Sequence, residues 1–325
     1  METVIGKVSK TPFIKWTGSK RKQAPYIVSK FPKVIDTYYE PFVGGASVLH
    51  ELLNEIFVGN IICKKIICSD LNKDLINIWN IFIDKNKRQK LFDYYSELHQ
   101  QLKDRAEYTE GFEVTAEQIK KCQTLYYEMR NKYNNFIENN IYNDERAMLF
   151  YWITRTSFNG LIRYNPKNGK FNSPFHVGGR FGITPNELEK VFNTWGMVID
   201  DYINNGGTIE FICDDYINVI KNAKTNDVIY MDPPYPKTGG MYFMHIFDYE
   251  KMYDIIEYVG KNGAKVLLSY DGKSGKEDRT EINMRHWYKT HEYVESGHSS
   301  FKKLKSASRG KENKDMVYDS LYMNY

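Results

Sequence analysis

The residues best suited to chemistry in this sequence are Asp232-Pro233-Pro234-Tyr235. They bring together one carboxylate, one aromatic ring, and backbone carbonyls beside prolines that carry no N–H. This set suits an amino group on a planar ring, because Asp232 and a carbonyl would accept its two hydrogens while Tyr235 stacks on the ring. Proline and aspartate are also common turn residues, so an ordinary turn at the end of a strand is the alternative interpretation.

The segment before this tetrapeptide shows how it would be positioned. Residues 227–231 form an apolar run rich in β-branched and aromatic residues, which predicts a buried strand. Two successive prolines cannot donate to a sheet ladder, so the strand must end near Asp232. Ligands bind outside the carboxyl ends of the strands in open α/β sheets. We therefore expect Asp232 to lie at the ligand-binding edge of such a sheet.

A second loop of this kind lies near the amino terminus. Residues 37–49 predict a strand, a two-glycine turn and the start of a helix, an arrangement that lets a ligand approach the backbone closely. The glycine spacing is not GxGxxG, so it does not imply a dinucleotide. The next predicted strand ends at Asp70, which would either bind ribose hydroxyls or cap the helix that begins near Asn72.

Two basic segments could bind anions. Residues 12–22 place Lys20, Arg21 and Lys22 at the expected start of a helix, where backbone N–H groups favour negative charge. Residues 302–314 contain six basic residues and one acidic residue, which would suit a flexible phosphate-binding loop. For both segments a solvated basic surface is the alternative interpretation.

A third basic segment, residues 155–175, also carries several aromatic residues. Asn159-Gly160 and Asn168-Gly169 are strong turn signals, so a β-hairpin or a looped ribbon is expected. Its basic side chains could bind phosphates and guanine edges, and its aromatic rings could stack on bases or insert between them. A structural loop with packed aromatic residues is the alternative.

A long helical region interrupts the alternation of strands and helices. From residue 72 to about 200 the apolar spacing is helical, and the alternation returns with a strand at 208–213 that leads to Asp214. We therefore expect a catalytic α/β domain made of residues 1–71 and 201–325, with residues 72–200 inserted as a mainly helical domain. In the second part we expect a mobile flap at residues 236–246 and a helix at 248–260. A buried strand at 264–270 and a last strand at 315–325 should follow.

Composition limits the class of protein without deciding its function. The chain has 325 residues, 42% of them hydrophobic, and a net charge of +4, which fits a globular protein able to bind nucleic acid. The four cysteines form no CxxC pair and the seven histidines show no zinc-binding spacing, so we expect reduced thiols and no metal. We find no signal peptide and no membrane-spanning stretch, and we expect a cytoplasmic protein.

Five segments together resemble, in the same order, those of the Dam-type DNA adenine-N6 methyltransferases, also called the D12 class. The resemblance covers nearly the whole chain. Ser19 replaces a glycine of the family pattern in a turn that serine also fits, and Phe158 stands where a tyrosine is expected in Dam relatives. The segments are Lys15-Trp16-Thr17-Gly18-Ser19-Lys20, Glu40-Pro41-Phe42-Val43-Gly44-Gly45-Ala46-Ser47-Val48, Ser69-Asp70-Leu71-Asn72, the hairpin from Phe158 to Phe175, and Asp232-Pro233-Pro234-Tyr235.

The resemblance implies a Rossmann-like methyltransferase fold that uses S-adenosylmethionine, with an inserted target-recognition domain. Asp232 and the Pro233 carbonyl would accept the N6 hydrogens of an adenine that has left the double helix, and Tyr235 would stack on that adenine. The whole catalytic loop would be Asp232, Pro233, Pro234 and Tyr235. The implied cofactor contacts are Trp16, Lys20, Phe42, Gly44, Ser47, Asp70, Asp214 and Asp232. The implied DNA contacts are Phe158, Asn159, Arg163, Tyr164 and Asn172.

The resemblance also implies a substrate. Arg163 matches the family's hairpin arginine and would read a guanine beside the target adenine, with GATC-like sites as the leading expectation. We expect a monomer that acts on double-stranded DNA, as an orphan enzyme or beside a restriction endonuclease that acts separately. Two other functions stay open: methylation of an amine in RNA or of a protein glutamine, and non-catalytic binding of nucleic acid. The basic, aromatic insert argues against the first and the intact catalytic tetrapeptide against the second.

Overall fold

The computed structural model contains two compact units. The helical unit consists of residues 1–19 and 72–201, and the sheet unit consists of residues 20–71 and 202–325. The expected flap at 236–246 and the basic loop at 302–314 lie outside the residues that the structure describes. Those residues are 11–107, 115–176, 182–235, 247–274, 277–278, 280, 285–298 and 316–325.

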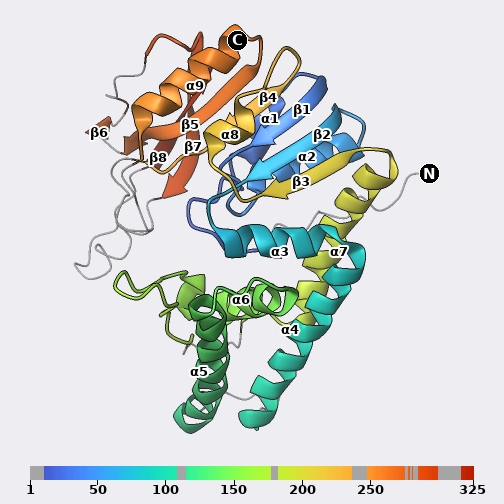
Figure 1. The fold of residues 1–325 in the computed structure, drawn as a ribbon, viewed down its shortest axis with the longest axis vertical. Coiled ribbons are helices and arrows are strands. Elements are labelled where there is room, and N and C mark those ends of the chain that lie inside the picture. Colours follow the sequence, from blue (N-terminus) through green and yellow to red (C-terminus); the bar gives the residue numbers. More distant parts are fainter. Residues whose placement is uncertain are drawn as a thin grey trace. The chain divides into compact units, whose positions relative to one another are not determined.

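The sheet unit is built on one mixed sheet (Figure 1). Its strand order is β3-β2-β1-β4-β5-β8-β7, and the short β6 pairs with β5. The first five strands in this order are parallel to one another, whereas β8 is antiparallel to both β5 and β7. The bounds are β1 Val34–Glu40, β2 Ile62–Ser69, β3 Thr208–Ile212, β4 Val228–Met231, β5 Lys265–Ser274, β6 Glu277–Asp278, β7 Thr290–His298 and β8 Met316–Met323.

The strand order reverses next to β1. From β1 the chain proceeds outward through β2 and β3, and it later returns to the other side of β1 with β4 and β5. The loops that leave the carboxyl ends of β1 and β4 therefore diverge, and a crevice at such a reversal is the usual ligand site of an open α/β sheet. Glu40 ends β1 and Asp232 directly follows β4, so both residues lie at this edge.

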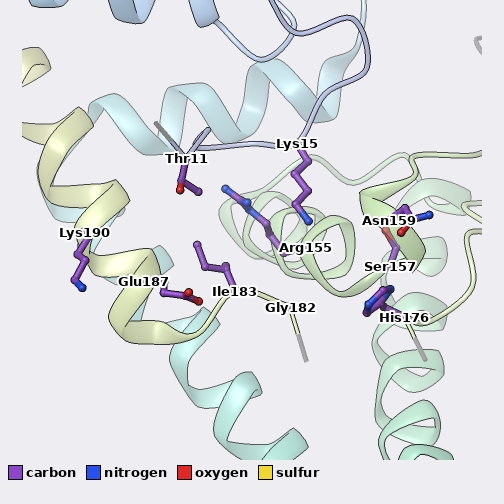
Figure 2. Close-up of a pocket in the computed structure, with 10 residues that line it drawn as sticks. All are labelled: Thr11, Lys15, Arg155, Ser157, Asn159, His176, Gly182, Ile183, Glu187 and Lys190. Carbon is purple, nitrogen blue, oxygen red and sulfur yellow. The ribbon is translucent and has the colours of Figure 1, made fainter. Parts of the chain in front are cut away.

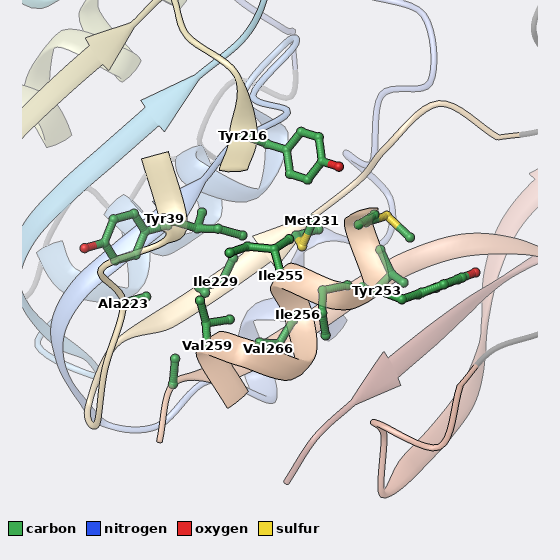
Figure 3. Packing of buried hydrophobic residues seen from close by; sticks show 14 of the residues in the cluster. Tyr39, Tyr216, Ala223, Ile229, Met231, Tyr253, Ile255, Ile256, Val259 and Val266 are labelled. Atoms are coloured by element: carbon green, nitrogen blue, oxygen red, sulfur yellow. The ribbon is translucent and has the colours of Figure 1, made fainter. Parts of the chain in front are cut away.

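Helices α8 (Tyr216–Ile220) and α9 (Tyr249–Lys261) cover one face of this sheet (Figure 3). Ile229 and Met231 of β4 join residues of both helices in one buried apolar cluster. Because side chains alternate between the faces of a strand, Tyr230 lies on the opposite face. The apolar run before the catalytic loop is therefore buried on both faces, as expected of a central parallel strand.

The helical unit has an aromatic core. Phe13 packs against Trp79, Phe82, Tyr151 and Phe192, with ring centroids 3.9–5.7 Å apart. These contacts explain why residues 1–19 group with the helices, although we expected them in the catalytic domain. The bounds are α3 Lys73–Ile83, α4 Lys85–Arg105, α5 Ala116–Glu138, α6 Asp144–Thr156 and α7 Pro185–Asn204, of which α7 continues into the sheet unit. In the sheet unit, α1 spans Ala24–Ser29 and α2 spans Ser47–Phe57.

Polar caps divide the helical region more finely than its periodicity predicts. Within this region of helical spacing, residues 73–105 form two helices, because the carboxylate of Asp84 accepts the backbone N–H groups of Asn86 and Lys87 and starts α4. Asn143 likewise starts α6 by accepting the N–H of Arg146. Strand β7 was not expected. In the described part of the chain, no helix is long and apolar enough to cross a membrane.

Residues 157–175 form what we call the ribbon. Two isolated antiparallel bridges hold it, one between Ser157 and Phe175 and one between Tyr164 and Phe171. Of the two forms expected, a β-hairpin or a looped ribbon, the structure shows the looped ribbon: its two sides meet, but they form no continuous ladder in the described residues.

Side-chain contacts explain the interrupted ladder. The 3-10 helix η1 (Phe158–Gly160) includes Asn159 at φ 54°, which is the left-handed turn that the Asn-Gly pair predicted. Farther along, the hydroxyl of Ser173 accepts the backbone N–H of Arg163 at 3.1 Å and donates to the Leu161 carbonyl at 2.6 Å. A side chain thus bonds to two backbone groups that a regular hairpin would pair with the backbone of the opposite side.

Candidate active site

Asp232 is the centre of a polar cluster in the sheet unit. Its Oδ1 lies 2.9 Å from the ammonium nitrogen of Lys20 and accepts a hydrogen bond from the Tyr235 hydroxyl at 3.2 Å. The same ammonium lies 5.0 Å from the centroid of the Tyr235 ring, within cation–π range. The fold thus brings an expected cofactor contact, Lys20, to two expected catalytic residues.

The ammonium of Lys20 has a second carboxylate neighbour, Asp319 of β8, at 3.6 Å. The Lys20 side chain is only 8% exposed. Burial lowers the pKa of Lys20, but Asp232 and Asp319 outweigh this effect and the net pKa shift is upward. Lys20 is therefore charged, and the three residues carry one net negative charge when both acids are ionised.

Glu40 adds a fourth titratable group at the end of β1. It is 3% exposed, and its Oε2 accepts a hydrogen bond from the Tyr38 hydroxyl at 2.8 Å. Burial raises the pKa of Glu40 to about 8; the Tyr38 hydrogen bond opposes this rise and the Asp232 carboxylate adds to it. At neutral pH Glu40 therefore keeps its proton and adds no charge to the cluster.

The glycine loop after β1 is tied to the end of β2. The carboxylate of Asp70 accepts the backbone N–H of Gly44 at 3.3 Å. The residue that caps α3 is Asn72, whose side-chain oxygen accepts the Leu75 N–H at 3.0 Å. Asp70 therefore does not cap α3, because Asn72 does. Its carboxylate lies beside the glycine loop instead.

Other expected cofactor contacts are placed as follows. Phe42 anchors the glycine loop to the apolar cluster, with its ring centroid 5.2 Å from that of Tyr216. Ser47 is the first residue of α2, directly after the loop. Trp16 belongs to the helical unit, so its part in cofactor binding stays a prediction.

Asp214 follows β3 at the same edge of the sheet as Asp70 follows β2. Its Oδ1 accepts the side-chain amide of Asn218 at 3.0 Å and the N–H of Asp215 at 2.7 Å, and these two hydrogen bonds lower its pKa. The adjacent parallel strands β2 and β3 are therefore each followed by a carboxylate that accepts local hydrogen bonds.

The catalytic loop is held from α9. The Tyr249 hydroxyl donates to the Pro234 carbonyl at 2.9 Å, and the Tyr235 ring centroid lies 5.6 Å from that of Tyr270. Pro233 is buried, whereas Asp232 and Tyr235 stay partly accessible. The loop is therefore buried where it meets the core, and its Asp232 and Tyr235 side chains remain partly accessible.

The expected DNA contacts on the ribbon differ in their surroundings. Arg163 is exposed, and its Nε–H donates to the Asn172 side-chain oxygen at 2.7 Å. Phe158 is 43% exposed, whereas the Tyr164 hydroxyl lies 3.0 Å from that of Tyr133 on α5. Arg163 and Phe158 are thus presented to solvent, whereas the hydroxyl of Tyr164 contacts α5.

A recess of about 350 Å³ lies beside Asn159 in the helical unit (Figure 2). Figure 2 shows Lys15 and Arg155 together on one side of it and Lys190 on another. The Arg155 guanidinium donates to the carbonyls of Pro12 and Phe13, so it also holds the segment that carries Lys15. The lining is Thr11, Lys15, Arg155, Ser157, Asn159, His176, Gly182, Ile183, Glu187 and Lys190.

Comparison with known proteins decides the family. The D12 class N6 adenine-specific DNA methyltransferase family matches residues 16–301, which is most of the chain. The chain belongs to this family. It is an adenine-specific DNA methyltransferase, and this assignment selects DNA methylation over the alternatives considered from the sequence.

Curated relatives agree with the family. The Type II methyltransferase M.MjaIII of Methanocaldococcus jannaschii is 27% identical over 97% of this chain and 99% of its own length. The Type II methyltransferase M1.LlaDCHI of Lactococcus lactis subsp. cremoris is 28% identical over 81% of this chain and 82% of its own. The DNA adenine methylase of Haemophilus influenzae is 29% identical over 70% and 65%.

Two residues at this candidate site were not expected from the sequence. Asp319 contacts Lys20 from the last strand, and Tyr249 holds the catalytic loop from a helix. A weak signal existed for Asp319, because it is the one acid in the otherwise apolar and hydroxylated run at 316–323. Nothing in the sequence marks Tyr249 among the other tyrosines, because its role depends on the packing of α9 against the loop.

Proposed function

We propose that this enzyme transfers a methyl group from S-adenosylmethionine to N6 of an adenine flipped out of duplex DNA, at specific sites. The observation that carries the proposal is the Lys20–Asp232–Tyr235 cluster at the sheet edge where the strand order reverses. The sheet unit would perform the chemistry and the inserted helical domain, residues 72–200, would recognise the target. We expect a monomer acting on double-stranded DNA.

The residues at this edge of the sheet fit S-adenosylmethionine, the methyl donor of the family. The Asp70 carboxylate beside Gly44 suits ribose hydroxyls, because a carboxylate accepts two hydrogen bonds and the glycine has no side chain in the way. The carboxylates of Asp232 and Asp319 beside Lys20 would complement a sulfonium cation. When bound, S-adenosylmethionine supplies an electrophilic methyl group.

The catalytic loop would orient the adenine amino group. Both donors to Asp232 meet Oδ1, so Oδ2 would accept one N6 hydrogen while the Pro233 carbonyl accepts the other. These two hydrogen bonds draw the N6 lone pair out of conjugation with the ring and aim it at the methyl group, while Tyr235 stacks on the base. Asp232 is already paired with Lys20, so its main contribution is position and charge rather than strong basicity.

The ribbon would recognise DNA. A guanidinium pairs with O6 and N7 of guanine, so Arg163 would read a guanine beside the target adenine, as in GATC-like sites. Phe158 is exposed and has no polar group, which suits insertion into the space left by the flipped base. The positive recess at Lys15, Arg155 and Lys190 would add contacts to the DNA backbone.

One experiment tests the proposal as a whole. The gene is expressed in a host that lacks DNA methylation, and N6-methyladenine is mapped in the genome by single-molecule sequencing. We expect methylation at one short motif that contains a G next to the methylated A, and none in cells with the Asp232→Ala variant. Methylation spread without a motif would contradict site recognition. If a restriction endonuclease encoded next to this gene cuts the same motif when it is unmethylated, the enzyme has a restriction–modification role. If there is no such endonuclease, it has an orphan role.

A further inference from the structure

Helix α5 contacts the ribbon along one face, through residues spaced four apart. The Tyr126 hydroxyl and the Arg130 guanidinium both donate to the carbonyl of Ser173, at 3.0 and 3.2 Å. One turn farther along, Asn134 reaches Phe171. Residues at this spacing lie on one side of a helix, so α5 runs along the returning side of the ribbon.

Asn134 makes the most specific of these contacts. Its amide NH2 donates to the Phe171 carbonyl at 3.1 Å, and its side-chain oxygen accepts the Phe171 N–H at 2.8 Å. A side-chain amide thus pairs with both backbone groups of one residue, as a neighbouring strand would do. Asn134 is 8% exposed and Phe171 is 1% exposed, so these hydrogen bonds are shielded from water.

The adjacent residue on α5 holds the opposite side of the same bridge. The Tyr133 hydroxyl lies 3.0 Å from the Tyr164 hydroxyl and donates to the carboxylate of Asp74 at 2.6 Å. Arg146 fixes that carboxylate through two hydrogen bonds, at 2.6 and 2.9 Å. Residues 133 and 134 therefore hold Tyr164 and Phe171, the two partners of the isolated bridge.

The residue pair next to this bridge is Arg163 and Asn172. Carbonyls alternate in direction along an extended segment, so those of Phe171 and Ser173 face α5 while that of Asn172 faces Arg163. The Asn172 carbonyl accepts Nη2–H of Arg163 at 3.3 Å and its side-chain oxygen accepts Nε–H at 2.7 Å. One edge of the guanidinium is thereby occupied, and its terminal Nη1–Nη2 edge is the one available for a base.

We propose that Asn134 and Tyr133 of α5 are positioning residues for sequence recognition: they set the Tyr164–Phe171 bridge and thereby aim the Arg163 guanidinium. The inference rests on the proposed reading of guanine by Arg163. It adds that discrimination between bases depends on a helix whose anchoring side chains are buried under the ribbon. Two backbone hydrogen bonds close this bridge, from the Asn172 N–H to the Arg163 carbonyl at 2.9 Å and from the Asn165 N–H to the Lys170 carbonyl at 2.8 Å. Side chains of α5 hold the outer backbone groups of Phe171 and the hydroxyl of Tyr164, and so fix where the bridge lies on the helix.

The test compares kcat/KM on a cognate duplex with kcat/KM on a duplex in which the guanine read by Arg163 is replaced. This ratio does not depend on the fraction of folded enzyme, so a merely destabilising substitution leaves it unchanged. In Asn134→Asp the ionised carboxylate still accepts the Phe171 N–H but has no hydrogen for the Phe171 carbonyl. We expect its ratio to fall about fivefold or more, since one bidentate contact carries discrimination of that order.

Two further variants complete the design. Asn135→Asp makes the same change one position along on the exposed face of α5 and should keep the wild-type ratio. Tyr133→Phe keeps the ring but removes the hydroxyl that meets Tyr164, and it should lower the ratio even if Asn134→Asp does not fold. Lowering the pH should restore the ratio of Asn134→Asp, because the protonated carboxyl group again donates to the Phe171 carbonyl.

Three outcomes decide the inference. A lowered ratio in the Asn134 and Tyr133 variants but not in Asn135→Asp supports it. A wild-type ratio in Asn134→Asp overturns the inference, provided that Arg163→Ala still relaxes base preference. If Asn134→Asp does not fold, a wild-type ratio in Tyr133→Phe overturns it under the same condition. Unchanged preference in Arg163→Ala removes Arg163 from the readout and overturns both the proposed reading of guanine and this inference.

Discussion

The Lys20 ammonium lies between two carboxylates, and only one of them belongs to the catalytic loop. Asp319 lies 3.6 Å from the ammonium, so it continues to neutralise Lys20 if Asp232 is removed. Loss of Asp232 therefore leaves no unpaired buried charge, which would otherwise destabilise the fold strongly. This pairing makes it possible to separate the catalytic role of Asp232 from a structural one.

We predict that Asp232→Ala loses at least about 100-fold in methyl transfer, the usual effect of removing a principal transition-state contact. Its thermal unfolding and its binding to duplex DNA should stay close to those of the wild type. Single-turnover methylation and melting curves measure the two effects, with Glu210→Ala, an accessible carboxylate on β3, as the control. A variant that keeps a tenth of the wild-type rate would show that Asp232 lacks the proposed role.

Glu40 makes the stability of the sheet unit depend on pH. Its folded-state pKa of about 8 lies above the ordinary value of 4.5. Between these two pH values, Glu40 is therefore protonated in the folded protein and ionised in the unfolded chain. Stability from this group therefore falls as the pH rises from about 4.5 to about 8 and then levels off.

We predict that Glu40→Gln raises the melting temperature relative to the wild type by a few degrees at pH 8, and by little at pH 5. Glutamine still accepts the Tyr38 hydroxyl but never ionises, so the variant avoids the cost of a buried charge. Melting curves of both proteins from pH 5 to 8.5 measure the difference. Equal curves across this range would mean that Glu40 titrates near its ordinary value.

At the scale of elements, sequence patterns predict what is local. The apolar run before Asp232, the glycine loop and the Asn159-Gly160 turn each depend on neighbouring residues, and each appears in the structure. Apolar spacing alone would predict that the helix continues past Asp84. It does not, because the Asp84 side chain caps the start of α4.

What the sequence could not predict depends on contacts between distant segments. Strand β7 contains His, Glu and Gly and lacks a clear alternation, so it becomes a strand only by pairing with β8. The sequence left a hairpin and a looped ribbon open, and the ladder is interrupted because the Ser173 side chain bonds to the Arg163 N–H and the Leu161 carbonyl. The Lys20–Asp319 contact joins the first helix region to the last strand, and no local pattern encodes it.

The ribbon presents two exposed residues with different chemistry, and their substitutions should differ accordingly. We predict that Arg163→Ala relaxes preference at one base, because a bidentate guanine contact is worth about 1–3 kcal/mol. Phe158→Ala should lower activity on all sites and leave preference unchanged, because stacking does not distinguish bases. Methylation of a randomised-site library by each variant measures both effects.

The opposite result has a simple interpretation. If Arg163 only bound phosphate, Arg163→Ala would weaken binding equally on all sequences and flatten the salt dependence of the affinity. Unchanged base preference together with a shallower salt slope would therefore assign Arg163 to the DNA backbone.

At the scale of the whole molecule, the chain folds as two compact units. The expected cofactor residues Gly44, Asp70 and Asp214 belong to the sheet unit, and the ribbon belongs to the helical unit. Each unit has its own core, one apolar beside β4 and one aromatic around Phe13. A substitution in one unit should therefore leave the internal packing of the other unchanged.

This division predicts that the two binding reactions separate. Asp70→Asn still accepts the Gly44 N–H through its side-chain oxygen, so the loop should stay in place, but it replaces a charged acceptor for ribose hydroxyls. We expect S-adenosylmethionine affinity to fall about 10- to 100-fold, the range for a hydrogen bond to a charged group, and DNA affinity without cofactor to stay unchanged. Arg163→Ala should lower DNA affinity and leave S-adenosylmethionine affinity unchanged.

Calorimetry on the double variant tests this separation. Its Kd for S-adenosylmethionine should equal that of Asp70→Asn, and its Kd for DNA should equal that of Arg163→Ala. A change of more than about threefold in the other ligand's Kd would show that the two sites are coupled.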